Sequence, residues 1–166
     1  MDCAHKFVRI DNRLLHGQVV QFWIPYLKVE HLVIADDIAA STPAMISVYR
    51  MAVPKRIRLS VVKISMLQSL LNEQQGTEKT LVVLGDVFDF ARALMSGFEC
   101  RCITLGNVHS APGRERVTDA VFLSKEELAA LTEYSQQGRL VEIQTFPGDV
   151  LKLRYSDDKG VSWFRS

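Results

Sequence analysis

The chain has 166 residues, of which 48% are hydrophobic and 23% charged, and its formal net charge at pH 7 is +1. These values predict an ordinary globular protein with a single domain over residues 1–166, and they exclude a general electrostatic attraction to nucleic acid or to an anionic membrane. Because the sequence shows no signal peptide, no membrane-length apolar run and no paired-cysteine zinc pattern, we expect a soluble, cytoplasmic protein without a metal, in which Cys3, Cys100 and Cys102 are reduced thiols.

Strand-like apolar runs alternate with helix-like segments along the chain. This alternation predicts a doubly wound, mostly parallel α/β sheet of the Rossmann-like kind, with helices on both faces. The expected strands are residues 6–10, 31–35, 57–62, 80–84 and 101–105, a short run at 117–123, and 141–146, which would close the sheet. The expected helices are 17–27, 43–52 after Ser41-Thr42, 65–73, 87–96 after the cap Asp86, and 125–137 after a capping box of Ser124 and Glu127.

Several stretches need separate interpretation. Residues 74–77 form a polar connection, and residues 106–113 contain enough turn formers to predict a loop. Pro25 would require a kink or an early end in the first helix, in which Trp23 is interpreted as a core residue. The tail from Pro147 is compatible with a docked strand or with a mobile end, and its apolar side chains leave a homo-oligomer open.

The most informative stretch runs from Val8 to Val20, where a strand, a polar loop and a helix start follow one another. His16 lies about where the first free N–H groups of the helix point outward and favour an anion such as phosphate. Arg13 can bind phosphate through two parallel hydrogen bonds, and Gly17 lets backbone come close. A neutral imidazole at such a place can accept a phosphoryl group and pass it on. Arg-x-x-His by itself is a weak motif, since loop histidines are usually solvated or capping residues.

The longer string Arg9-Ile10-Asp11-Asn12-Arg13-Leu14-Leu15-His16-Gly17-Gln18-Val19 is more specific. It resembles the active-site segment of the enzyme IIB subunits of the mannose/fructose/sorbose-type phosphotransferase system. The resemblance continues at residues 33–37, 51–54 and 106–113, and so covers most of the chain. The sequence departs from the family at Asn12, where a second Asp is frequent, and at Thr104-Leu105-Gly106, where Asn-Val-Gly is common.

This resemblance implies an enzyme, a protein-phosphohistidine–sugar phosphotransferase, which needs no cofactor. A phosphorylated IIA protein or domain would transfer its phosphoryl group to Nδ1 of His16, and His16 would pass it to a sugar held by the membrane IIC and IID subunits. These partners would come from other chains, so the protein would associate peripherally with the membrane transporter. The residues expected to bind or support the phosphate are Asp11, Asn12, Arg13, Gly17 and Gln18.

Loops that follow neighbouring parallel strands open on the same edge of a sheet. Asp36 and Asp37, the turn at Gly85-Asp86 and the loop at 106–113 are therefore expected near His16. Either acid of the pair is interpreted as a helix cap or as a site residue that holds Arg13 or orients the imidazole. His109 is a further candidate support residue, with an ordinary turn residue as the alternative.

Two other classes of function compete with phosphotransfer. A nucleotide-binding domain would use the same strand–loop–helix unit, and Asp36 lies roughly 20 residues beyond the first loop, where a ribose-binding acid is expected. However, the glycines of a dinucleotide or P-loop motif are missing. A non-enzymatic interaction module would leave His16 as a surface residue without chemistry.

Overall fold

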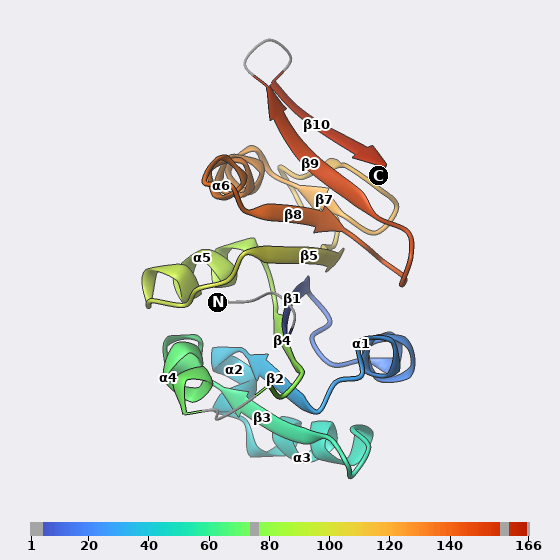
Figure 1. Cartoon of the computed structure of the whole chain (residues 1–166), viewed down its shortest axis with the longest axis vertical. Helices are drawn as coiled ribbons and strands as arrows, with labels where there is room; N and C mark the ends of the chain where they lie inside the picture. The colour runs from blue at the N-terminus through green and yellow to red at the C-terminus, as the bar shows by residue number, and fades with distance from the viewer. Residues whose placement is uncertain (1–4, 74–76, 157–159, 166) are drawn as a thin grey trace.

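The computed structural model describes residues 5–73, 77–156 and 160–165. Within these residues, an eight-stranded sheet runs through the whole molecule in the order β10-β9-β8-β5-β1-β4-β2-β3 (Figure 1). The strands from β8 to β3 in this order are parallel, whereas β9 and β10 pair antiparallel. The bounds are β1 (Lys6–Asp11), β2 (His31–Ala35), β3 (Arg58–Val62), β4 (Thr80–Leu84), β5 (Cys102–Asn107), β8 (Leu140–Ile143), β9 (Leu151–Ser156) and β10 (Gly160–Arg165).

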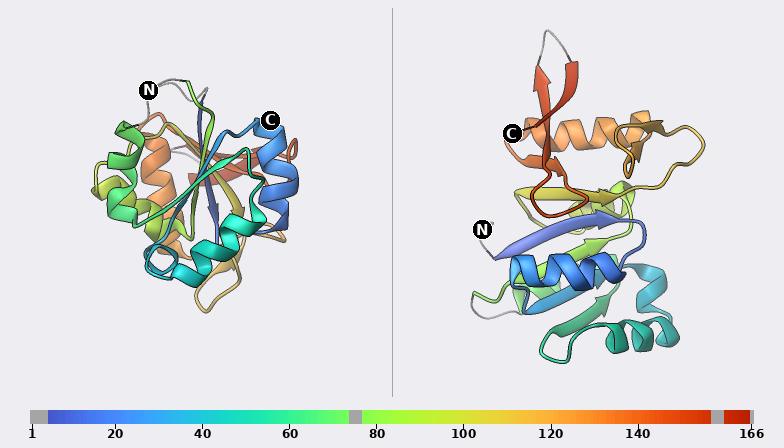
Figure 2. Two further views of the ribbon diagram at one scale, coloured as in Figure 1. Left: turned by 90° about the horizontal axis from the view of Figure 1, so that it is seen from below. Right: turned by 90° about the vertical axis from the view of Figure 1, so that its right-hand side faces the viewer.

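Helices cover both faces of the sheet (Figure 2). One face carries the π-helical turn η1 (Val19–Trp23), which continues into α1 (Ile24–Leu27), together with α2 (Asp37–Ala40) and α3 (Pro43–Ala52). The other face carries η2 (Ile64–Met66), α4 (Leu67–Asn72), α5 (Val87–Met95) and α6 (Lys125–Gln136). The expected mostly parallel, Rossmann-like α/β fold is confirmed.

Side-chain alternation along the central strands produces two apolar cores. In β2, Leu32 and Ile34 pack with η1, α1 and α3, whereas Val33 and Ala35 pack with α4 and α5. Because successive residues of a strand point to opposite faces, a strand buried on both sides reads as a continuous apolar run. This explains why the predicted bounds of β2 and β4 agree with the structure.

The structure corrects the predictions after β5. Gly106 and Asn107 belong to β5 instead of a loop, because Asn107 pairs with Asp11 across a bulge in the ladder. The run at 117–123 is not one strand: β6 (Glu115–Arg116) and β7 (Phe122–Leu123) form a small separate hairpin. Residues 141–146 do not close the sheet, since β9 adds to β8 and β10 adds to β9. The described part of the tail is thus docked on the sheet as strands β9 and β10, so the docked alternative holds and the mobile end does not.

The first helix keeps its predicted length but changes its hydrogen bonding. Residues 17–27 are helical, yet the segment Val19–Trp23 is π-helical, with Ile24 N–H bonded to Val19 O. Pro25 follows the π-helical segment inside this helix, which ends two residues later at Leu27, in line with the expected early end. Trp23 is 4% exposed and belongs to the core, as expected. Cys3 and residues 74–76 of the expected connection lie outside the described residues.

No helix in the described part of the chain has both the length and the apolar character needed to cross a bilayer.

Candidate functional site

The candidate site lies at the carboxyl edge of β1, in the centre of the sheet between β4 and β5. Residues 12–16 form the loop from β1 to the helix, and the loop turns back at Leu14, whose N–H bonds to Asp11 O (2.9 Å). Leu14 has a φ of 53°, a left-handed conformation that is costly for a residue other than glycine. Leu14 and Leu15 are both buried in the apolar core, which holds the loop in this conformation.

Asp11 is the centre of the hydrogen-bond network, and it is fully buried. Its Oδ1 accepts from the backbone N–H and from Nε of Arg13, at 3.2 and 3.1 Å. Its Oδ2 accepts from Nε and Nη2 of Arg9, at 3.3 and 3.1 Å, and from Nη2 of Arg13 at 3.3 Å. One carboxylate is therefore surrounded by two guanidinium groups.

His16 contacts the same carboxylate. Its Nε2 lies 3.0 Å from Asp11 Oδ2, and its side chain is 15% exposed. Because a carboxylate is only an acceptor, this contact places the single N–H of a neutral imidazole on Nε2. Among the described residues, Nδ1 of His16 has no hydrogen-bond partner. The bare nitrogen is thus Nδ1.

The charges of the network favour an ionised Asp11. Burial by itself would raise the pKa of this carboxyl group, but the hydrogen bonds from His16 and Arg13 and the charge of Arg9 outweigh burial and hold the pKa below its usual value. With two arginines and one carboxylate, the group carries an excess positive charge beside the imidazole. This excess suits a ligand that brings negative charge to Nδ1.

Arg13 is the cationic side chain closest to solvent in this network, with 34% of it exposed. Its Nη2 also donates to Oε1 of Gln18 (3.1 Å), which fixes the guanidinium between the loop and the first turn of the helix. Within the described residues, Nη1 of Arg13 has no partner. The structure therefore brings Asp11, Arg13, His16 and Gln18 together in direct contact.

The start of the helix lies directly after His16. The first helical hydrogen bond runs from Val20 N–H to His16 O (3.2 Å), so the N–H groups of Gly17 and Gln18 precede the helical ladder. Gly17 is exposed, and apart from its chain neighbours and the backbone of its own helix, a Cβ at this position would meet no described atom within 4 Å. The start of the helix next to His16 is therefore accessible from solvent.

The side chain of Asn12 links the site loop to the two neighbouring loops. Its Nδ2 donates to Gly85 O, after β4, and its Oδ1 accepts from the backbone N–H of His109, after β5, both at 2.6 Å. His109 thus reaches the site loop through its backbone, while its residue as a whole is exposed. Asn12 supports the shape of the loop and does not contact the imidazole.

Asp36 and Asp37 serve other contacts. Asp36 caps α2 by accepting from the N–H of Ala39 (2.6 Å), and Asp37 accepts from Ile64 N–H (3.0 Å) and from Arg92. The bond from Arg92, followed by that from Ile64, keeps the pKa of Asp37 below its usual value. The idea that one of these acids holds Arg13 or the imidazole is wrong, because Asp11 makes both contacts.

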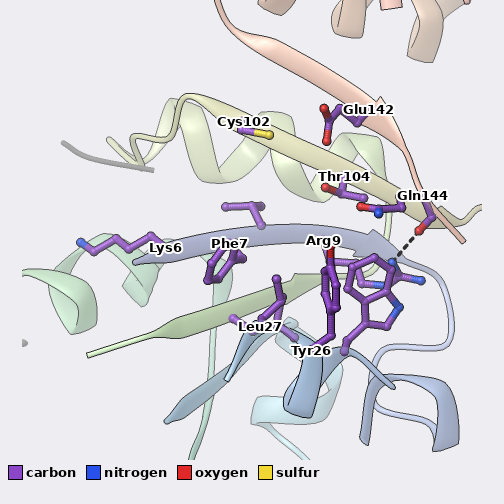
Figure 3. A pocket seen from close by; sticks show the side chains of 12 residues that line it. Lys6, Phe7, Arg9, Tyr26, Leu27, Cys102, Thr104, Glu142 and Gln144 are labelled. Atoms are coloured by element: carbon purple, nitrogen blue, oxygen red, sulfur yellow. Dashed lines mark hydrogen bonds between the residues drawn. The ribbon is translucent and has the colours of Figure 1, made fainter. Parts of the chain in front are cut away.

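Arg9 is the site residue that sequence reasoning missed. It lies two positions before Asp11 on β1, so both side chains point to the same face. Its Nη1 donates to Gln144 O (2.9 Å; Figure 3), and its guanidinium lies 4.5 Å from the centre of the Trp23 ring. An arginine and an aspartate two apart in an apolar strand were the signal that could have revealed this pair.

Fold and site together define an α/β protein that presents an oriented histidine beside positive charge at the carboxyl edge of its sheet. Residues 5–153 match the model of the family described as PTS system sorbose subfamily IIB component. The chain therefore belongs to this family, whose members take part in phosphotransfer during sugar uptake.

Individual relatives agree with this assignment. The chain is 30% identical to a probable phosphotransferase enzyme IIB component of Streptococcus pyogenes, over 76% of this chain and 81% of the relative. It is 23% identical to the mannose-specific EIIAB component of Escherichia coli, over 90% of this chain and 46% of that protein. The solved structure of manxB from Thermoanaerobacter tengcongensis is similar with a TM-score of 0.77 at 26% identity, covering 86% of this chain and 87% of that one.

Proposed function

We propose that His16 accepts a phosphoryl group on Nδ1 from a phosphorylated IIA protein and passes it to a sugar held by membrane IIC and IID subunits. The observation that carries the proposal is the contact between His16 Nε2 and Asp11 Oδ2 (3.0 Å). It keeps the proton on Nε2 and leaves the lone pair of Nδ1 in the ring plane, available for attack.

The first transfer needs no proton to leave His16. The lone pair of Nδ1 forms a bond to phosphorus while the P–N bond of the donor phosphohistidine breaks and returns its electron pair to the donor ring. In the second transfer, the oxygen of a sugar hydroxyl attacks the phosphorus and loses its proton to solvent, and the P–Nδ1 bond returns its pair to His16. Both steps depend mainly on alignment and on neutralisation of phosphoryl charge.

Arg13 and the helix start are suited to bind the phosphoryl oxygens. Nη1 of Arg13 remains available beyond the contacts that Asp11 and Gln18 make with Nε and Nη2. The N–H groups of Gly17 and Gln18 add fixed donors at the positive end of the helix. Asp11, Asn12 and Gln18 support this arrangement by holding His16, the loop and Arg13, respectively.

The family supports the choice of a IIA protein as the donor. The mannose-specific relative from Escherichia coli is an EIIAB component, so its name joins IIA and IIB parts, and this chain matches 46% of its length. We infer that a IIA protein or domain supplies the phosphoryl group here as well. Gly17, the residue after His16, is exposed, so a donor can reach this end of the helix from solvent.

The test is incubation with a phosphorylated IIA protein of the mannose/sorbose type, followed by mapping of the adduct. We expect an acid-labile, base-stable phosphoryl group on His16. His16→Ala should fold with an unchanged melting temperature and accept none, and His109→Ala, which removes the exposed imidazole of the neighbouring loop, should still be phosphorylated. Phosphate retained on His16→Ala, or mapped to His5, His31 or His109, would overturn the assignment. A nucleotide-binding domain or an interaction module would give no adduct at all.

A further inference from the structure

Arg9 is a charged side chain that the apolar environment of the sheet should disfavour. It is 1% exposed and lies at one end of a groove of about 250 Å³ between η1–α1 and strands β1, β5 and β8 (Figure 3). Burial in this position lowers the pKa of Arg9, against the opposing effect of Asp11. A buried ion pair is a weak source of stability, because the desolvation of both groups offsets their attraction. Stability alone therefore does not account for an arginine here.

The guanidinium of Arg9 is fixed on every side. Two of its nitrogens bind Asp11 Oδ2, the third binds Gln144 O, and the ring of Trp23 lies 4.5 Å from its central carbon. Gln144 directly follows β8, so Arg9 reaches across β5 to the next strand of the sheet. Such a group has one orientation and can impose it on Asp11.

Gly106 on β5 makes the space for this guanidinium. A Cβ built on Gly106 would lie 2.0 Å from both Cζ and Nη2 of Arg9 and 2.4 Å from Nε, all closer than atoms can approach. The clash involves the part of Arg9 that is fixed by four contacts, so it cannot be relieved by a small shift. Arg9 therefore requires glycine at position 106.

Asp11 Oδ2 is shared between Arg9 and the imidazole. The oxygen that accepts from Arg9 Nη2 (3.1 Å) also faces His16 Nε2 (3.0 Å). The orientation of this oxygen determines which nitrogen of His16 carries the proton and in which direction Nδ1 points. Arg9 itself is too deeply buried to contact a phosphoryl group on His16.

From these contacts we propose that Arg9, admitted by Gly106, is a positioning residue for phosphotransfer: it fixes Asp11 Oδ2 so that His16 holds its proton on Nε2 and presents Nδ1. The proposal rests on the proposed function of His16. It differs from the role of Arg13, which lies near solvent and is available to the phosphate.

The test uses Arg9→Ala, Arg9→Lys, Gly106→Ala and the double variant Arg9→Ala/Gly106→Ala. Arg139→Ala is the matched control, because Arg139 also stacks on an aromatic ring, that of Tyr134 at 4.9 Å, away from the site. The first measurement is the imidazole ¹⁵N spectrum of His16 in the unphosphorylated protein, which needs no donor. The second is single-turnover transfer from a phosphorylated IIA protein and from the small donor phosphoramidate.

We expect the parent protein to show the Nε2–H tautomer of His16, and Arg9→Ala and Gly106→Ala each to show a mixture of the two tautomers. Transfer at saturating donor should slow on the order of tenfold or more with both donors, while the half-saturating concentration of the IIA protein stays unchanged. Arg9→Lys should transfer faster than Arg9→Ala but more slowly than the parent, since lysine keeps the positive charge but lacks the forked guanidinium group. Gly106→Ala should lower the transfer rate of the parent protein. In the Arg9→Ala variant it should cause no additional loss, because its Cβ then meets no guanidinium.

Three outcomes would overturn the proposal. One is a folded Arg9→Ala protein with the Nε2–H tautomer and the parent rate; another is an equal loss in Arg139→Ala. The third is a loss confined to the half-saturating concentration of the IIA protein, which would make Arg9 part of donor docking. If Arg9→Ala does not fold, Gly106→Ala and Arg9→Lys decide the question by the same readouts. If the parent accepts no phosphate, the proposed function fails, whereas the tautomer spectra still judge the role of Arg9.

Discussion

The backbone N–H of His109 donates a hydrogen bond to Oδ1 of Asn12 over 2.6 Å, which attaches the loop after β5 to the loop that carries His16. The Nδ2 of the same Asn12 side chain donates to Gly85 O, so one amide joins the loops that follow three adjacent strands, β4, β1 and β5. The site loop is thereby held at both sides by a single residue.

Removal of this amide should loosen the loop. We expect Asn12→Ala to lower the free energy of unfolding by about 1–2 kcal/mol, because two hydrogen bonds are lost and the N–H of His109 and the C=O of Gly85 lose a partner. Urea unfolding measures the effect. Ser47→Ala is the control: the Ser47 hydroxyl bonds to Pro43 O on an exposed helix face, and its loss should stay within about 0.5 kcal/mol. Equal effects of the two changes would contradict the bridging role of Asn12.

The central strands and the cap of α6 were predictable because their signals are local. β2 and β4 are apolar on both faces and therefore appear as uninterrupted apolar runs. The capping box of Ser124 and Glu127 is present in the structure as the sequence indicated. By contrast, the turn formers Gly106 and Asn107 are drawn into β5 by pairing with β1, and the tail becomes β9 and β10 only because β8 offers a free edge.

The sequence predicted most residues of the candidate site but not the hydrogen bonds that connect them. The string from Asp11 to Gln18 indicated a phosphate-type loop, and the structure brings four of its side chains into contact. Gly106 matters because it leaves space for Arg9, a residue almost one hundred positions earlier in the chain. Which aspartate contacts His16 and which ones bind helix N–H groups depends on the orientation of each side chain. No local pattern encodes either feature.

His31 provides a test of pH dependence outside the site. It is fully buried, with Nε2 2.8 Å from the Ser60 hydroxyl, while Arg58 donates to Nδ1 over 2.9 Å. Protonation of Nδ1 would place its N–H against the N–H of Arg58, so that two donors face each other. Burial, followed by the charge of Arg58, lowers the pKa of His31 from 6.5 to about 4, although Glu78 lies 3.8 Å from Nδ1.

Because the folded pKa of His31 lies below the unfolded one, the unfolded chain binds the proton more readily in acid. Its contribution to stability is complete above pH 6.5 and is lost as the pH falls toward 4. We expect about 2 kcal/mol of the free energy of unfolding to be lost between pH 7 and pH 5. His31→Gln should be less stable at pH 7 but should not lose this free energy between pH 7 and pH 5. His109→Gln, which changes an exposed histidine, should lose it as the parent does. If the free energy of unfolding of His31→Gln depends on pH as that of the parent does, His31 is not the cause of the pH dependence.

Gly17 offers a test of the direction from which the donor approaches His16. Apart from its chain neighbours and the backbone of its own helix, a Cβ at this position meets no described atom within 4 Å, so Gly17→Ala should be stabilising by about 0.4–1 kcal/mol through the reduced freedom of the unfolded chain. If the donor approaches His16 over the exposed Gly17, the added methyl group should slow transfer from a phosphorylated IIA protein. Transfer from phosphoramidate, a much smaller donor, should change less. Equal rates of parent and variant with the IIA protein would show that the donor does not approach over Gly17.

The last prediction concerns Arg13 and distinguishes a phosphate ligand from a charge that merely attracts the donor. Arg13→Ala should slow single-turnover transfer from a phosphorylated IIA protein on the order of 100-fold, or roughly 3 kcal/mol of transition-state stabilisation. Arg13→Lys should recover only part of the loss, since an ammonium group cannot bind two phosphate oxygens as the guanidinium fork does. Stability should hardly change, because Arg13 is one-third exposed and Asp11 retains Arg9 and His16.

The dependence on salt separates the two roles. A guanidinium in contact with phosphate should leave a deficit that persists at high ionic strength, whereas long-range attraction fades as screening increases. Arg92→Ala is the matched control, because it removes an exposed arginine that pairs with Asp37 and Asp89 and does not contact Asp11 or His16. Its effect on transfer should be small and should vanish at high salt. If Arg13→Ala behaves in the same way as Arg92→Ala, Arg13 does not bind the phosphoryl group, and the N–H groups of Gly17 and Gln18 become its principal ligands.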